Sequence, residues 1–263
     1  MLLAHRILSN AFFARLGNSG WGRYCSPRGF YPLVGTLVPW LSVGALILSA
    51  LGVYIGLVLA PADAGHGGIY RIVFVHVPAT WMSVFIFLLV AFWAGFGLLV
   101  QTRLPAMMAQ ALAPTGAMFA FMALWTGSLW GKPVWGGWWI WDTRLIAELV
   151  LLLFYLAIIA FHAAIEDADR ADKAAAVVAL IGAAIVPLSL MSVVFWPKIH
   201  QNPSVTASGS SDLAVMTVAG LLAVAAGFWM YGSAMALARL RCVILERERR
   251  SDWVTRCTGG NAT

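Results

Sequence analysis

The chain has 263 residues, of which 61% are hydrophobic and only 11% are charged. A soluble globular domain carries about a quarter of charged residues, so the composition excludes that class. The net charge of +6 does not require a nucleic-acid partner. It is explained by cations that gather on one side of a membrane.

The amino-terminal segment, residues 1–36, is basic and contains no acidic residue. We interpret it as an arm that lies along an anionic lipid leaflet. An organellar transit peptide is the alternative, because such peptides are also rich in Arg and poor in acids.

Six apolar stretches follow, each long enough to cross a bilayer as a helix, which takes about 20 residues. They cover 37–59, 79–100, 109–129, 145–165, 174–196 and 213–238. Lipid leaves no water for open backbone groups, and none of the stretches alternates like a barrel strand. The sequence therefore predicts an all-α integral membrane protein with a six-helix membrane domain at 37–240 and a basic tail at 241–263.

The distribution of Lys and Arg predicts the orientation of these helices. Of the 17 cations, only Arg71, Lys132, Arg144 and Lys198 lie on the side opposite the two termini. We expect both termini in the cytoplasm, or in the matrix if the membrane is mitochondrial. The three cysteines form no CxxC pair, and a GxxxxGK[ST] phosphate loop is absent, so zinc-site and nucleotide-hydrolysis motifs are excluded.

With six spans and an inner start, the loops after the first, third and fifth spans share the outer face. The first of these loops ends at His76, with Pro78 predicted to open the next helix, and the last contains His200. His66 is interpreted as an ordinary loop residue. The middle loop, 130–143, contains the run WGKPVWGGWWIWD.

Five tryptophans crowd this middle loop around two glycines: Trp130, Trp135, Trp138, Trp139 and Trp141. Interfacial tryptophan belts scatter their residues over helix ends, so a belt alone explains this run poorly. The concentration favours a stacking platform for a large, flat, apolar ligand. Asp142, which closes the run, is predicted to cap the following helix.

Two histidines beside an aromatic surface suggest haem as that ligand. Neutral imidazole is a common axial ligand of haem iron, which takes one ligand on each side of the porphyrin. Hydrogen-bonded structural roles for His76 and His200 are the alternative. The propionates need cations, and the outer face offers Arg71, Lys132, Arg144 and Lys198, of which arginine suits carboxylates best.

Glu148 is an acidic residue inside the predicted fourth span. An intramembrane carboxylate is costly and is by default a functional candidate. The simpler interpretation, which we prefer, is an ion pair with Arg144 one turn earlier.

These residues also carry a resemblance to a known family. The run WGKPVWGGWWIWDTRL is similar to the tryptophan-rich WWD signature of haem-handling proteins in cytochrome c maturation. The segments APAD, RIVFVHVP around His76 and HQ at His200 resemble CcmC, the haem exporter protein C family, from about residue 37 to 240. The second histidine departs from the usual pattern because prolines flank it on both sides.

The resemblance implies a protein that holds haem b as transient cargo at the periplasmic face and delivers it to the haem chaperone CcmE. It further implies that CcmD and the ABC-type pair CcmA and CcmB are partners. The resemblance also implies a multi-pass protein of the bacterial inner membrane that has no enzymatic activity. The mitochondrial inner membrane is the alternative location. His76 and His200 occupy the positions of the family's axial ligands.

Two other functions compete with this prediction. A permease for haem or another solute should show polar residues in mid-span, yet apart from Glu148 the helix centres offer only Thr, Ser and Gly. A b-type electron carrier should hold its histidines within spans and show a second haem site or a quinone site. Neither pattern is evident in the sequence.

Overall fold

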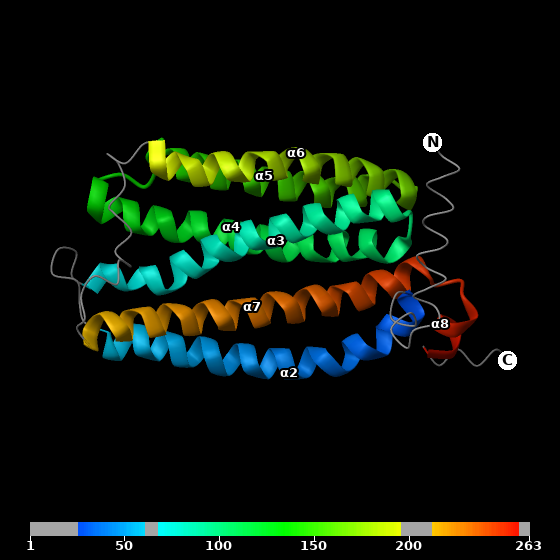
Figure 1. Ribbon diagram of the computed structural model, residues 1–263, viewed down its shortest axis with the longest axis horizontal. Coiled ribbons are helices and arrows are strands. Elements are labelled where there is room, and N and C mark those ends of the chain that lie inside the picture. Colours follow the sequence, from blue (N-terminus) through cyan, green and yellow to red (C-terminus); the bar gives the residue numbers. More distant parts are fainter. Residues whose placement is uncertain (1–25, 61–67, 196–211, 258–263) are drawn as a thin grey trace.

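The computed structural model describes residues 26–60, 68–195 and 212–257, except for the side chains of 185, 188–195 and 212–214. All regular structure in these ranges is helical (Figure 1). The long helices are α2 (Pro27–Tyr54), α3 (Val73–Val100), α4 (Arg103–Trp135), α5 (Thr143–Ala164), α6 (Ala168–Phe195) and α7 (Asp212–Arg247). The short ones are η2 (Ile55–Leu59), η3 (Gly68–Ile72) and α8 (Asp252–Cys257).

The long helices run side by side in alternating directions (Figure 1). The end of the bundle with the start of α2, the end of α7 and α8 is called the basic end here. The opposite end, with the start of α3 and the turn from α4 to α5, is called the tryptophan end. Five of the helices, all but α6, are long and apolar enough to cross a membrane over their described residues. The prediction of an all-helical membrane protein is thus confirmed, while the sixth span and the orientation stay predictions.

The helices begin and end elsewhere than the sequence predicted. Helix α2 starts at Pro27, so residues 27–36 belong to it and not to a separate arm. Ser26 explains this start, because its hydroxyl accepts the amide of Gly29 at 3.3 Å and a proline favours the first helical position.

Helix α7 continues to Arg247, so the first part of the predicted tail 241–263 is helical and continuous with the last span. The tail then folds back against the start of α2. Trp253 of α8 packs edge-on against Tyr31, with ring centroids 5.8 Å apart, and its indole donates to Glu248 at 2.7 Å. The described part of the tail is therefore joined to the membrane domain.

Helix α3 begins at Val73, not at Pro78, so His76 and Pro78 both lie inside it. A proline this near a helix start removes only one backbone hydrogen bond. Extending the helix satisfies the remaining amides in a region that lipid surrounds, and this gain outweighs the lost bond.

Helix α2 packs mainly on α7, and α7 in turn packs on α3 and α4. Helices α3 to α6 form the rest of the bundle, with α4 in contact with both α3 and α5. Its centre is aromatic: Phe87, Phe119 and Tyr155 are almost completely buried, and the rings of Phe87 and Tyr155 meet edge to face at 5.0 Å. This centre is closely packed across α3, α4 and α5.

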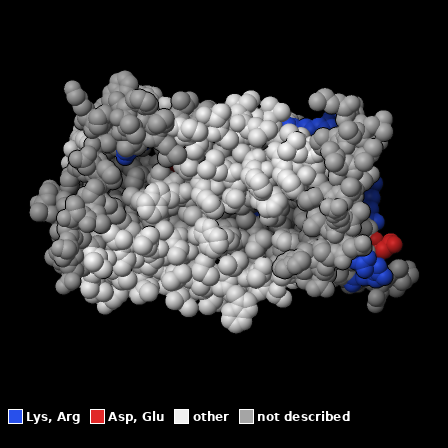
Figure 2. All heavy atoms as spheres, in the orientation of Figure 1, with Lys and Arg blue, Asp and Glu red and all other residues white. Residues whose placement is uncertain are grey.

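The outward faces of the helices carry large apolar side chains. Leu46 is 72% exposed and Trp40 is 76% exposed. An apolar surface of this extent would drive aggregation in water, but it suits contact with lipid chains. On the face in Figure 2, charged side chains gather toward the ends, and uncharged atoms fill most of the band between them.

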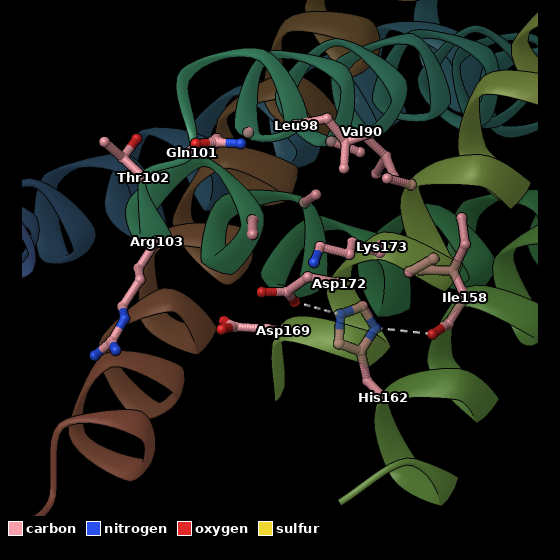
Figure 3. A pocket seen from close by; sticks show the side chains of 16 residues that line it. Val90, Leu98, Gln101, Thr102, Arg103, Ile158, His162, Asp169, Asp172 and Lys173 are labelled. Atoms are coloured by element: carbon pink, nitrogen blue, oxygen red, sulfur yellow. Dashed lines mark hydrogen bonds and ion pairs between the residues drawn. The ribbon is translucent and has the colours of Figure 1, made fainter. Parts of the chain in front are cut away.

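A partly buried ionic network joins four helices at the basic end. Arg247 of α7 donates to both carboxylate oxygens of Asp172 on α6, each at 2.7 Å, and to Gln110 of α4 at 2.5 Å. His162 of α5 lies 3.1 Å from Asp172 and 2.9 Å from the Ile158 carbonyl (Figure 3).

Burial alone would raise the pKa of Asp172, but the hydrogen bonds and charges of Arg247 and His162 lower it below its usual value. The folded state therefore binds the proton of Asp172 less readily than the unfolded chain does. The network stabilises the fold above the unfolded pKa of Asp172 and loses this contribution only as the pH falls through the folded value.

We expect Arg247→Met to lower the free energy of unfolding by about 1–3 kcal/mol at neutral pH, because it leaves the partly buried Asp172 carboxylate without its main partner. Thermal unfolding of the detergent-solubilised protein measures this loss. The control is Arg250→Met, which changes an exposed arginine at the same end of the bundle. Equal stability of the two variants would contradict a structural role for the network.

Candidate functional site

The tryptophan run is less of a loop than the sequence predicted. Helix α4 continues to Trp135, so Trp130 and Trp135 are helical, and only 136–142 connect α4 to α5. Gly136 ends α4 with φ +78°, a conformation that favours glycine, and its amide bonds to the Lys132 carbonyl at 3.1 Å. The predicted outer loop 130–143 is therefore half helix.

The predicted helix cap at Asp142 is confirmed. Its carboxylate accepts the Arg144 amide at 2.8 Å, and the residue is only 6% exposed. An acidic cap at a helix start satisfies a free amide and complements the helix dipole. The start of α5, and with it the Arg144 side chain, is thereby held in a fixed place.

The five tryptophans differ in their surroundings. Trp130 packs edge-on against Tyr70, and Trp139 packs edge-on against Trp141. The ammonium group of Lys132 lies 5.9 Å from the centre of a Trp138 ring. Trp135, Trp138 and Trp141 are exposed at 43%, 58% and 80%. The run thus presents wide aromatic surface, as the predicted stacking platform requires.

His76 points from the first turns of α3 toward α4. Its Nδ1 lies 2.9 Å from the Thr126 hydroxyl. Gly127 makes this approach feasible, because an added Cβ there would lie 3.3 Å from His76 Cε1 and 3.3 Å from Leu145. The imidazole is therefore seated against the α4 backbone, close to the start of α5.

The Thr126 hydroxyl decides which nitrogen of His76 carries the proton. Its own hydrogen goes to the Met122 carbonyl at 2.7 Å, so towards His76 it offers a lone pair. Nδ1 then carries the hydrogen and donates, which leaves the lone pair of Nε2 free. A free Nε2 lone pair is what a metal ligand needs, and a fixed Nδ1–H bond orients such a ligand.

Sequence reasoning missed Thr126. A threonine inside an apolar helix usually bonds to a carbonyl of the preceding turn, so nothing in the sequence marks this one as a partner of a residue 50 positions away. Only its place in the packed bundle identifies it.

The predicted cations Arg71 and Arg144 both lie at the tryptophan end. Arg71, in η3, donates to the Leu57 carbonyl on η2. Arg144, in the first turn of α5, lies within electrostatic range of His76. Three buried N–H donors in this region, Arg71 Nε, Arg144 Nε and Trp139 Nε1, have no hydrogen-bond partner in the part of the chain that is described.

Unpartnered buried donors are costly, at about 1–3 kcal/mol each. The three donors come from η3, from α5 and from the segment between α4 and α5, yet they share one end of the bundle. An anion with several oxygens, such as a carboxylate, matches them chemically. Together with a free imidazole nitrogen and exposed indoles, they suit a flat, apolar, anionic ligand that contains a metal.

The preferred ion pair between Arg144 and Glu148 is wrong. The ion pairs described for this chain lie at the basic end, and Glu148 is in none of them. Glu148 is buried, at 8% exposure, and instead faces Ser83 of α3. The i, i+4 spacing brings two side chains near each other, but here Glu148 turns into the helix interface.

Some predicted residues lie outside the described ranges, namely His66, Lys198 and His200. Within those ranges no group of three or more His, Cys, Asp or Glu could hold a metal ion. The described part of the site therefore offers one imidazole, His76, and any further metal ligand has to come from elsewhere.

A cavity of about 280 Å³ lies at the basic end, away from these residues (Figure 3). Its rim includes Arg103, Asp169 and Lys173, and its inner wall includes Val90 and Ile158. One turn deeper, Phe87 and Tyr155 are fully buried against each other. This aromatic pair separates the cavity from the tryptophan end along α3 and α5.

Comparison with known proteins relates the chain to one family. The family model described as CcmC, Heme exporter protein C, matches residues 20–255. The chain is 39% identical over 229 residues to Heme exporter protein C of Escherichia coli (strain K12), covering 87% of this chain and 92% of that protein. It is 41% identical over 227 residues to the protein of the same name from Bradyrhizobium diazoefficiens, covering 86% of each. The identity to the Haemophilus influenzae protein of that name is 35% over 231 residues.

We expect nuclear magnetic resonance of the ¹⁵N-histidine protein to detect His76 with a protonated Nδ1 and an unprotonated Nε2. Thr126→Val removes the acceptor and should give a mixture of both tautomers, whereas Thr126→Ser should keep the wild-type form. Thr115→Val changes another buried threonine of α4 and is the control. A protonated Nε2 in the wild type would overturn the assignment.

Proposed function

The chain belongs to the heme exporter protein C family, and on that premise we propose that it holds haem at the tryptophan end and delivers it to the haem chaperone CcmE. Haem is then cargo that leaves the protein, not a resident cofactor, and the protein acts as a carrier without catalysing a reaction. The proposal draws its main support from the three unpartnered donors, because they call for an anionic ligand beside a free imidazole nitrogen.

His76 is proposed as one axial ligand of the haem iron. Its Nε2 carries the free lone pair, and the Thr126 bond at 2.9 Å keeps the ring oriented. His200 is proposed as the second ligand, on the strength of the family resemblance and of the shared face that six spans imply.

The haem propionates are proposed to meet Arg71, Arg144 and the Trp139 indole. Each of these groups has a buried N–H without a partner, and arginine binds carboxylates through its planar fork. Asp142 supports this arrangement indirectly, because it caps the helix start that carries Arg144. Lys132 stays close to the Trp138 ring and is a further cation at this end.

The porphyrin plane is proposed to lie on the exposed indoles of the tryptophan run. Trp135, Trp138 and Trp141 offer flat apolar surface, and Trp130 is braced by Tyr70. Stacking of this kind holds a ligand without a covalent bond. Such contacts suit a cargo that must be released.

We further propose six spans with α6 as the fifth, both termini in the cytoplasm, and the tryptophan end at the periplasmic face of the bacterial inner membrane. The cations at the basic end support this orientation through the positive-inside rule. CcmD and the ABC-type subunits CcmA and CcmB are proposed as partners, alongside the surrounding lipids.

A permease that moves haem through the bundle is the second candidate, and the packing disfavours it. The interior between the basic-end cavity and the tryptophan end is filled by side chains such as Ile86, Phe87 and Tyr155, each at most 2% exposed. A haem-sized path would have to displace this aromatic centre, whereas binding at the outer end requires no such change.

We expect His76→Ala to alter the Soret band of the haem-loaded protein, because one axial bond is lost. Replacing Trp138 and Trp139 together by Ala should lower haem affinity by roughly tenfold, because the variant loses about 0.5–1.5 kcal/mol of Trp138 stacking and the proposed bond from the Trp139 indole to a propionate, while His ligation stays visible. Trp40→Ala, on the lipid-facing side of α2, is the control. Unchanged haem occupancy in the double tryptophan variant would exclude the platform.

The proposed orientation predicts the results of reporter fusions. Fusions at Gly67, Gly137 and Asn202 should report the periplasm, and fusions at Pro105 and Asp169 the cytoplasm. A cytoplasmic result at Gly137 would place the tryptophan end on the wrong side of the membrane for this function.

A further inference from the structure

Glu148 is a buried acid that the proposed haem site does not use. It lies in α5 one turn after Arg144, within a helix long and apolar enough to cross the membrane. It is 8% exposed, and its Oε1 is buried without a hydrogen-bond partner in the described chain. An ionised carboxylate in such surroundings would be costly, because no ion pair among the described residues compensates its charge.

The hydroxyl groups along this part of α3 and α5 already donate to backbone carbonyls. Tyr155 donates to the Ser83 carbonyl at 2.7 Å, Ser83 donates to the Thr80 carbonyl at 2.8 Å, and Thr80 donates to the His76 carbonyl at 3.0 Å. Glu148 faces the Ser83 hydroxyl. That oxygen therefore presents lone pairs to the carboxyl group.

A carboxylate only accepts hydrogen bonds, so it has no match in the Ser83 lone pairs. A protonated carboxyl group does match, because its own O–H donates to the Ser83 oxygen. Burial favours the neutral acid, and the bond from Ser83 to the Thr80 carbonyl leaves the Ser83 oxygen available as an acceptor for that acid.

Few other titratable groups lie near Glu148 on the elements that pack against it. They are His76 on α3, Lys132 on α4, and Asp142, Arg144 and Tyr155 on α5 itself. The titratable residues of α6 all lie in its first turns, at the basic end: Asp169, Arg170, Asp172 and Lys173. Asp142 is engaged at the helix cap, so Arg144 is the nearest cation along α5.

We propose that Glu148 is a buried proton-binding site, and that its proton and the anionic cargo are held together. The linkage to cargo rests on the proposed function, whereas the proton site does not.

The linkage follows from the place of Arg144. Glu148 forms no ion pair with Arg144, but it lies one helical turn further along α5. An ionised Glu148 would therefore repel a propionate bound at Arg144, with little water between them to screen the charges. A neutral Glu148 adds no such repulsion. Haem affinity should therefore fall as the pH rises and Glu148 loses its proton, and by reciprocity bound haem should retain the proton.

Infrared spectroscopy of the haem-free protein tests the proton site. At neutral pH, protein labelled with ¹³C-glutamate should show the carbonyl stretch of a protonated carboxylic acid, shifted by the label. The other glutamates, Glu166, Glu246 and Glu248, lie outside the described hydrophobic core, so the band should belong to Glu148. It should vanish in Glu148→Gln and persist in Glu166→Gln. A wild-type spectrum without the band at neutral pH overturns the proposal even if the variant fails to fold.

Haem titrations across pH test the linkage. Over the pH range in which the infrared band disappears, wild-type affinity should fall by up to about tenfold per pH unit, the limit for one linked proton. Glu148→Gln should bind haem with little change over that range. Protonation of His76 acts in the opposite direction at low pH and affects both proteins alike.

The outcomes separate the two proposals. If neither protein binds haem while the band is present, the proposed function fails and the proton site stands. If both bind haem with the same pH dependence, or if the band persists at every pH at which affinity falls, the linkage is wrong. If Glu148→Gln does not fold, wild-type protein alone must show the band and the affinity falling together, and a mismatch between them refutes the linkage.

Discussion

Hydrocarbon supplies no hydrogen-bond partners, and this constraint governs every polar group inside the helix bundle. At the basic end Arg247, Asp172 and His162 bond to one another, although Arg241 Nε is buried there without a described partner. The tryptophan end has three such donors, which come from separate elements. This grouping is the reason for proposing that a ligand supplies acceptors at the tryptophan end.

The same lack of hydrogen-bond partners in lipid explains how Ser and Thr hydroxyls affect the protonation of neighbouring His and Glu side chains. Hydroxyl groups inside a membrane helix donate to carbonyls of the preceding turn, as Ser83 and Thr126 do. Once that hydrogen is committed, each hydroxyl presents only lone pairs to its neighbour. Thr126 thereby selects the tautomer of His76, and Ser83 selects the protonated form of Glu148. Helix packing thus determines the chemistry of both titratable residues.

The sequence predicted features that depend on long patterns or on local chemistry. The helical membrane class followed from apolar length, and the Asp142 cap followed from a polar residue before an apolar run. Features that depend on packing were missed or wrong. Glu148 turned toward Ser83 instead of Arg144, because spacing along one helix cannot reveal which neighbouring helix offers the better contact. Helix α3 begins before its predicted start at Pro78, and α4 continues past its predicted end at Trp130. In lipid, the gain from continued backbone hydrogen bonding exceeds the cost of a Pro or Gly in the helix.

A site that is incomplete without its ligand poses a problem for a protein that must give that ligand away. Releasing an anionic porphyrin uncovers the Arg144 and Trp139 donors again, at about 1–3 kcal/mol for each buried group that finds no new partner. Release is therefore easiest where water or a receiving protein reaches those donors as the cargo leaves. The exposed indoles of Trp138 and Trp141 mark the open side of the site, where such contact is feasible. His76 is seated against the α4 backbone. In the proposed site the imidazole would therefore stay fixed while the cargo leaves over the exposed indoles.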